Sequence, residues 1–142
     1  MEKIFFDTNI LVYAFDKNAG SKQQQTKALL KPFLTQYKQA IISAQVLHEL
    51  SYRLYRWNLS DAEVSTAIAP FKYWKIISND IHVFEKGLQL KKKHQTSFWD
   101  GLILAAAIQS GAKELWSEDF SNGQIYEGMK IVNPFEAKKV SP

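Results

Sequence analysis

Four carboxylates occupy positions that a protein with a buried sheet avoids unless they serve a function, and these are Asp7, Glu49, Asp100 and Asp119. Asp7 directly follows the apolar run 4–6, and Asp119 comes two positions after the run 115–117. Both runs are typical of strands, and the carboxyl ends of parallel strands form the edge where α/β sheets place their ligands. Two strand ends therefore present an acid to one edge. Glu118 follows the same strand, so Glu118 and Asp119 remain alternatives for the second of these acids.

The other two acids lie on predicted helices. Glu49 sits inside the amphipathic stretch 43–57, and Asp100 lies in the first turn of the strongly apolar stretch 98–109. A carboxylate above such apolar side chains costs free energy unless a cation meets it.

Each acid taken alone also has a structural interpretation. Asp100 can complete a capping box with Ser97, and Glu49 can pair with Arg53 one helical turn away. The two strand-end acids can be turn formers. Their joint occurrence at these positions favours a shared site.

Convergence of the four acids would have a definite chemical consequence. Each carboxylate raises the pKa of the others, so the cluster stays ionised near neutral pH only by binding cations. Ligands that are all oxygen select Mg²⁺ or Mn²⁺ rather than zinc. Such an ion can activate water and stabilise the charge of a phosphodiester undergoing in-line displacement. The predicted reaction is therefore phosphodiester hydrolysis.

The composition supports a globular protein with a polyanionic partner. The chain has 142 residues, of which 46% are hydrophobic and 23% are charged, and this predicts a single domain over residues 1–142. Its 18 basic and 14 acidic residues give a net charge of +4. Without the four acids the balance is 18 to 10, or +8, which suits a polyanion better.

Several function classes are excluded by what the sequence lacks. There is no cysteine, which rules out disulfides, thiolate zinc sites and a cysteine nucleophile. The three histidines have no metal-ligand spacing, and no glycine motif for binding nucleotide phosphates is present. No apolar run reaches the roughly 20 residues of a membrane span, and the N-terminus has no secretory pattern. We expect a cytoplasmic protein that does not associate with membranes.

Short apolar runs alternate with helical patterns along the chain and must position the acids. Strands are predicted at residues 3–7, 40–42, 75–77, 114–117 and 130–132. Helices are predicted after residue 8, over 26–37 with Pro32 kinking or dividing it, over 43–57 and 60–69, from an Asn79 cap to about residue 90, and over 98–109. About five short strands separated by helices favour a mainly parallel sheet covered on both faces.

At these residues the chain resembles the PIN-domain family, and most closely the VapC-type toxin ribonucleases of VapBC toxin–antitoxin pairs. The resemblance is carried by four motifs in order, at residues 5–11, 43–49, 97–100 and 115–119, and extends over essentially the whole length. It implies a three-layer α/β/α sandwich. It also carries Asp7, Glu49, Asp100 and Asp119 over as a catalytic, metal-binding quartet, with Thr8, Asn9 and Ser97 as supporting residues.

The resemblance further implies cleavage of single-stranded RNA, a cognate antitoxin protein that blocks the acidic pocket, and a homodimer. Two interpretations remain open within the fold: a housekeeping RNA-processing nuclease and a noncatalytic RNA-binding module. A phospho-accepting regulator also places acids and Mg²⁺ at a sheet edge, but the strands ending near residues 42 and 77 supply no acceptor aspartate.

Two aromatic features carry a functional and a structural interpretation. Trp99, beside Asp100, could stack on a base near the cut site, but we expect it in the core, where an aromatic residue at the start of an apolar helix usually lies. The cluster 55–57, with Arg53, either contacts RNA or a partner or forms a helix end over the core.

Overall fold

A six-stranded sheet forms the centre of the protein in the computed structural model, which describes residues 2–136. The strands are β1 (Ile4–Phe6), β2 (Ala40–Ser43), β3 (Lys75–Ile77), β4 (Glu114–Trp116), β5 (Ile125–Tyr126) and β6 (Met129–Val132). Their order is β3-β2-β1-β4-β6-β5, and every pairing is parallel except that of β5 with β6. The mainly parallel α/β sheet is confirmed. The prediction of about five strands missed β5, which has two residues and leaves almost no pattern.

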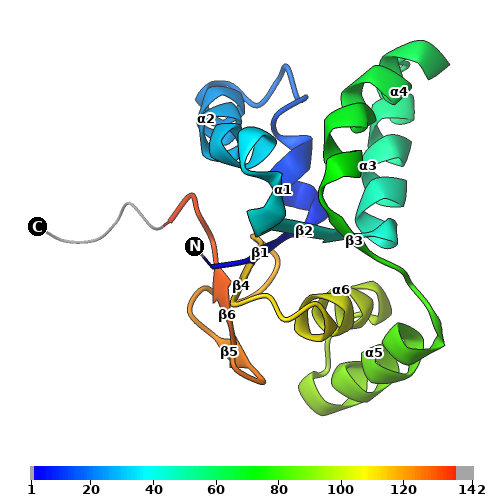
Figure 1. The fold of residues 1–142 in the computed structure, drawn as a ribbon, viewed down its shortest axis with the longest axis vertical. Coiled ribbons are helices and arrows are strands. Elements are labelled where there is room, and N and C mark those ends of the chain that lie inside the picture. The colour runs from blue at the N-terminus through cyan, green and yellow to red at the C-terminus, as the bar shows by residue number, and fades with distance from the viewer. Residues whose placement is uncertain (1, 137–142) are drawn as a thin grey trace, which may run out of the picture.

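Helices cover both faces of the sheet and complete three layers. They are α1 (Thr8–Val12), α2 (Ser21–Thr35), α3 (Ala44–Arg56), α4 (Asp61–Ile68), α5 (Ile81–His94) and α6 (Phe98–Gln109), with short 3₁₀ turns η1 (Tyr37–Gln39) and η2 (Ala69–Tyr73). Helices α1 to α4 lie on one side, and α5 and α6 lie on the other (Figure 1). The two central strands, β1 and β4, are therefore enclosed, and Phe5 and Leu115 have no solvent exposure.

Local capping signals decide where several helices begin. The Ser60 hydroxyl and the Glu63 carboxylate form the predicted capping box of α4. The predicted cap of α5 at Asn79 is wrong. The carboxylate of Asp80 accepts the N–H groups of His82 and Val83, while Asn79 reaches across to the N-terminus of α3.

Pro32 was expected to kink or to divide the helix around it, and it does not divide α2. The helix runs from Ser21 to Thr35, and Pro32 lies in its last turn. Pro32 lacks the N–H that would bond to the carbonyl four residues earlier, and α2 continues for only three residues beyond it. The helix begins at Ser21, five residues before the predicted start. The prediction missed this first part because the polar residues 21–25 carry no apolar periodicity.

Two glycines allow α5 and α6 to pack closely on one face of the sheet. A Cβ atom at Gly101 would lie 2.7 Å from the backbone oxygen of Gly87, and one at Gly87 would lie 2.7 Å from Leu102 Cδ2. This packing fixes the start of α6, which carries Asp100. Within residues 2–136, none of the helices combines the length and the apolar character needed to cross a membrane.

Candidate active site

The ends of β1 and β4 bring Asp7 beside the loop that carries Asp119. The two strands pair in parallel, and the backbone N–H of Asp7 donates to the carbonyl of Trp116 at 3.0 Å. The Ser117 hydroxyl donates to Asp7 Oδ2 at 2.7 Å and accepts the N–H of Asp119 at 2.9 Å. Asp7 Oδ1 accepts the N–H of Thr8 at 2.7 Å. One serine thus joins the two acid-bearing strand ends.

Glu49 is held at the same edge by residues from two helices. The Thr8 hydroxyl, at the start of α1, donates to Glu49 Oε1 at 2.6 Å. Gln45, one turn earlier on α3, donates to Glu49 Oε2 at 3.2 Å and to the carbonyl of Trp99 at 3.3 Å. The pairing of Glu49 with Arg53 is not the contact observed, because Arg53 lies over the ring of Trp57 instead.

Asp100 enters the site from the first turn of α6. The Ser97 hydroxyl caps this helix by accepting the N–H of Asp100 at 3.1 Å. The cap uses the backbone N–H of Asp100, while the residue also lines the cavity with the other three acids. Capping and a role in the site are therefore compatible at this residue.

All four acids line one open cavity of about 310 Å³ at the carboxyl edge of the sheet. Its walls are formed by Asp7, Thr8, Asn9, Val12, Gln45, Glu49, Tyr52, Arg53, Asp100, Ile103 and Asp119. The structure thus brings together the carboxylates predicted from positions far apart in the chain. Their placement on separate faces of the protein would have removed the basis for a shared site.

Burial and mutual repulsion alter the protonation of two of these acids. Asp7 is only 4% exposed, and its burial raises its pKa to about 7. The negative charges of Asp119 and Asp100 also act to raise this pKa, while the hydrogen bonds from Ser117 and Thr8 lower it. The pKa of Asp100 is also raised, first by burial and then by Asp119 and Glu49. The positive charge in the cavity is therefore too small to balance the negative charge of its carboxylates.

The alternative acid, Glu118, faces away from this cavity. Its carboxylate accepts the Tyr13 hydroxyl and the Lys22 ammonium, both at 2.6 Å. Its backbone N–H donates to Asn9 Oδ1 at 3.4 Å, whereas Asn9 Nδ2 is buried without a hydrogen-bond partner. Asp119, and not Glu118, lines the cavity with the other acids.

The chemistry of the donors fits a hard divalent cation. Carboxylate oxygens surround the cavity, and a buried acid with a raised pKa is stabilised when a cation replaces its proton. Within residues 2–136, no three acidic or histidine side chains already stand at the spacing of a formed metal site. Thr8 and Gln45 each donate a hydrogen bond to Glu49, and these bonds set the position of its carboxylate at the cavity.

Sequence reasoning missed the residues that hold the acids and misplaced one aromatic. Ser117 and Gln45 were given no role, although Ser117 ends the strand that carries the acid and Gln45 precedes Glu49 by one helical turn. The expectation that Trp99 is a core residue is wrong, since its side chain is 60% exposed. Its neighbour Phe98 packs against the core, and adjacent helical positions point about 100° apart.

Comparisons with known proteins agree with this architecture. The PIN domain family profile matches residues 4–122. A toxin–antitoxin complex from Klebsiella pneumoniae superposes with a TM-score of 0.71 at 21% identity, covering 93% of this chain and 98% of that one. The sarcin-ricin loop cleaving toxin VapC20 of Mycobacterium tuberculosis gives 0.63 at 18% identity, with coverage of 82% and 92%. VapBC2 from Rickettsia felis, bound to a promoter DNA fragment, gives 0.62 at 20% identity, with coverage of 90% and 96%. No curated protein matches the sequence.

Proposed function

The chain belongs to the PIN domain family, and from that premise we propose that it is a metal-dependent endoribonuclease that hydrolyses phosphodiesters of single-stranded RNA. The observation that carries the proposal is the cavity lined by Asp7, Glu49, Asp100 and Asp119. An RNA-binding module gains nothing from four carboxylates in one cavity, because they repel phosphate. A hydrolase that uses a divalent cation requires such a set.

The four carboxylates would hold Mg²⁺ or Mn²⁺ together. When bound, such an ion lowers the pKa of a bound water and offsets negative charge on the phosphate. The chain's own residues orient the carboxylates: Ser117 fixes Asp7, while Thr8 and Gln45 fix Glu49. Asp7, with its pKa near 7, must lose its proton before it can act as a ligand.

We further propose that the protein acts as the toxin of a toxin–antitoxin pair, with a cognate antitoxin covering the acidic cavity and a homodimer as the assembled form. The superposition on toxin–antitoxin complexes supports this choice over a housekeeping nuclease. Expression of the chain alone is expected to arrest growth, and coexpression of the product of a neighbouring small gene is expected to relieve the arrest. Normal growth with abundant active enzyme would favour the housekeeping role.

The enzymatic proposal is tested with the purified full chain and end-labelled single-stranded RNA, with Mg²⁺, Mn²⁺ or EDTA present. Cleavage is expected only with metal, and Asp7→Asn is expected to reduce it more than about 100-fold, beyond the loss typical for residues that merely hold a ligand. Asp61→Asn is the matched control, because Asp61 is exposed on α4, outside the cavity. Equal cleavage by Asp7→Asn, or no divalent binding by calorimetry, would refute a metal-dependent role for this cavity.

A further inference from the structure

A second hollow adjoins the acidic cavity and is lined by aromatic side chains. It has a volume of about 500 Å³, and its walls are Gln45, His48, Glu49, Tyr52 and Trp99. Gln45, Glu49 and Tyr52 also line the acidic cavity, so the two spaces share a wall and are neighbours. A strand bound across the acids can therefore place a neighbouring nucleotide in this hollow.

The two large aromatic side chains that line this hollow are largely exposed. Tyr52 and Trp99 are each 60% exposed. Their backbones are fixed: Tyr52 lies one turn after Glu49 on α3, and the carbonyl of Trp99 accepts the Gln45 amide at 3.3 Å. Arg56 lies over the Tyr52 ring at 5.9 Å from its centroid, and Phe98 packs against Trp99 with the centroids 5.0 Å apart. Much of each ring surface nevertheless remains accessible beside the proposed reaction centre, as in a platform for a flat ligand.

The charges near the rings favour a nucleic acid as that ligand. Arg53 lines the acidic cavity, and Arg56 lies along α3 with its guanidinium 3.3 Å from the Tyr52 hydroxyl. Alternating cations and aromatic rings are typical of surfaces that hold single strands, with phosphates on the cations and bases on the rings. A neutral base also suits the space beside Glu49 better than a phosphate does.

We propose that Trp99 and Tyr52 form a base-stacking subsite for the nucleotide of single-stranded RNA that flanks the cleaved phosphodiester. The proposal rests on the proposed nuclease function and names the part of its substrate that this surface binds. Stacking is tolerant of base identity, so the subsite supplies affinity and positioning. Trp99 has the larger ring and is expected to make the larger contribution.

The test measures binding of a fluorescein-labelled ten-nucleotide single-stranded RNA by fluorescence anisotropy. All proteins carry Asp7→Asn and are measured with Mg²⁺ so that hydrolysis does not interfere. Loss of one stacked base corresponds to about 1–3 kcal/mol, so Trp99→Ala is expected to weaken binding roughly 5- to 160-fold. Trp99→Phe is expected to retain most of the affinity, and Tyr52→Ala to show a smaller loss than Trp99→Ala.

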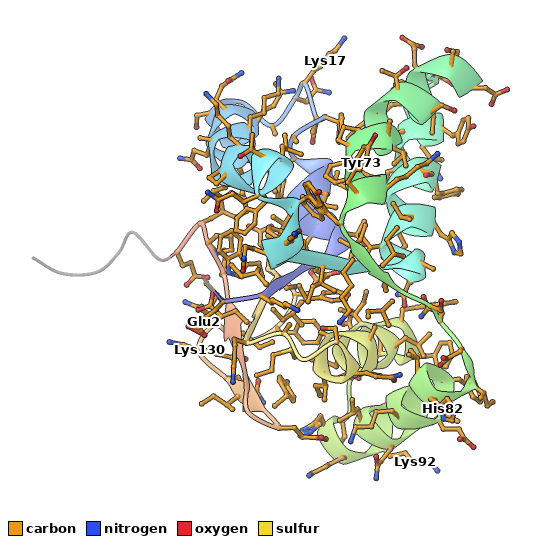
Figure 2. All side chains as sticks on the ribbon, viewed as in Figure 1. Glu2, Lys17, Tyr73, His82, Lys92 and Lys130 are labelled. Atoms are coloured by element: carbon orange, nitrogen blue, oxygen red, sulfur yellow. The ribbon has the colours of Figure 1, made fainter. Side chains whose placement is uncertain are left out.

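Two controls separate stacking from a general effect on the fold. Tyr73, labelled in Figure 2, is 72% exposed on η2 and lies outside both spaces, so Tyr73→Ala should bind as the parent does. An abasic oligonucleotide with the same phosphates should bind equally to the parent and to Trp99→Ala. Equal binding of the base-bearing RNA by the parent, Trp99→Ala and Tyr52→Ala would overturn the subsite. An equal loss of affinity in Trp99→Ala for the base-bearing and the abasic oligonucleotide would overturn it as well.

The outcomes of this test and of the nuclease test are distinguishable. If the wild-type protein cleaves RNA and both aromatic variants bind RNA unchanged, the stacking subsite is refuted and the nuclease function stands. Base-dependent binding without any metal-dependent cleavage removes the nuclease and keeps an RNA-binding surface.

Discussion

The hydroxyl of Ser117 donates a hydrogen bond of 2.7 Å to the carboxylate of Asp7, which lies 110 positions earlier in the chain. The same oxygen accepts the N–H of Asp119, so one side chain sets the spacing between two of the four acids. Asp7 is buried and repelled by its neighbours, and Ser117 is among the groups that stabilise its ionised form. Near neutral pH, Asp7 is therefore balanced between its protonated and its ionised form.

The raised pKa of Asp7 predicts that stability falls with pH when no metal is present. Below pH 3.8, Asp7 is protonated in both the folded and the unfolded chain and contributes no pH dependence. Between pH 3.8 and about 7 the unfolded chain releases this proton and the folded chain keeps it, so the free energy of unfolding decreases. At about 1.36 kcal/mol per unit, the decrease is about 4 kcal/mol.

Chemical denaturation in EDTA between pH 4 and 8 measures this effect. Asp7→Asn has no proton to release at this position, so the free energy of unfolding of the wild type should fall relative to that of the variant as pH rises. Parallel curves for the two proteins would contradict the raised pKa.

The same pKa predicts pH-dependent cation binding. A divalent ion must displace the proton of Asp7, so below pH 7 the affinity for Mg²⁺ should increase about tenfold per pH unit and then level off. Calorimetric titrations at pH 6 and 8 measure the difference and the proton released. Affinity that does not change with pH would mean that Asp7 does not bind the ion.

Thr8→Val is expected to reduce RNA cleavage by about 10- to 100-fold, because it removes the donor that orients Glu49 while keeping the shape of the side chain. Thr8→Ser keeps the hydroxyl and should restore most of the activity. Thr35→Val is the matched control, since the exposed Thr35 hydroxyl bonds only within α2. Full activity of Thr8→Val would show that Glu49 needs no such donor.

Glu118 and Asp119 are expected to respond differently to neutralisation. Glu118→Gln weakens the contact with Lys22, a partly exposed pair, so it should lower stability by about 1 kcal/mol or less and leave cleavage intact. Asp119→Asn removes a carboxylate from the cavity and should abolish cleavage. The reverse pattern, with activity lost in Glu118→Gln, would assign the fourth acid to Glu118.

Two glycine substitutions test the packing that places Asp100. Gly101→Ala brings a methyl group against the backbone oxygen of Gly87, which cannot move away, and should lower the free energy of unfolding by about 1–3 kcal/mol. Gly87→Ala has its closest contact with the end of the Leu102 side chain, which can turn aside, while the Leu102 backbone is no nearer than 3.3 Å, so it should cost less. Thermal unfolding of both variants gives the comparison, and an equal or reversed order would contradict it.

Much of the architecture can be read from local pattern. Apolar runs of three or four residues between amphipathic stretches predict the parallel strands, and the Ser60 capping box predicts the start of α4. The predicted edge of the sheet is where the four acids meet. These features follow from side-chain periodicity and capping, which act over a few residues and are therefore visible in sequence.

Only the tertiary structure decided which neighbours face the cavity. Glu118 and Asp119 are adjacent and chemically alike. What distinguishes them is that the fold brings Tyr13 and Lys22 to the carboxylate of Glu118. Phe98 and Trp99 are neighbouring aromatic residues, and the direction in which each leaves α6 decides that Phe98 packs against the core and Trp99 is exposed. The sequence by itself determined the acids, their strand-end and helix positions and the family. Their orientation depended on contacts between residues far apart in the chain, because a side chain's direction is set by what the fold packs against it.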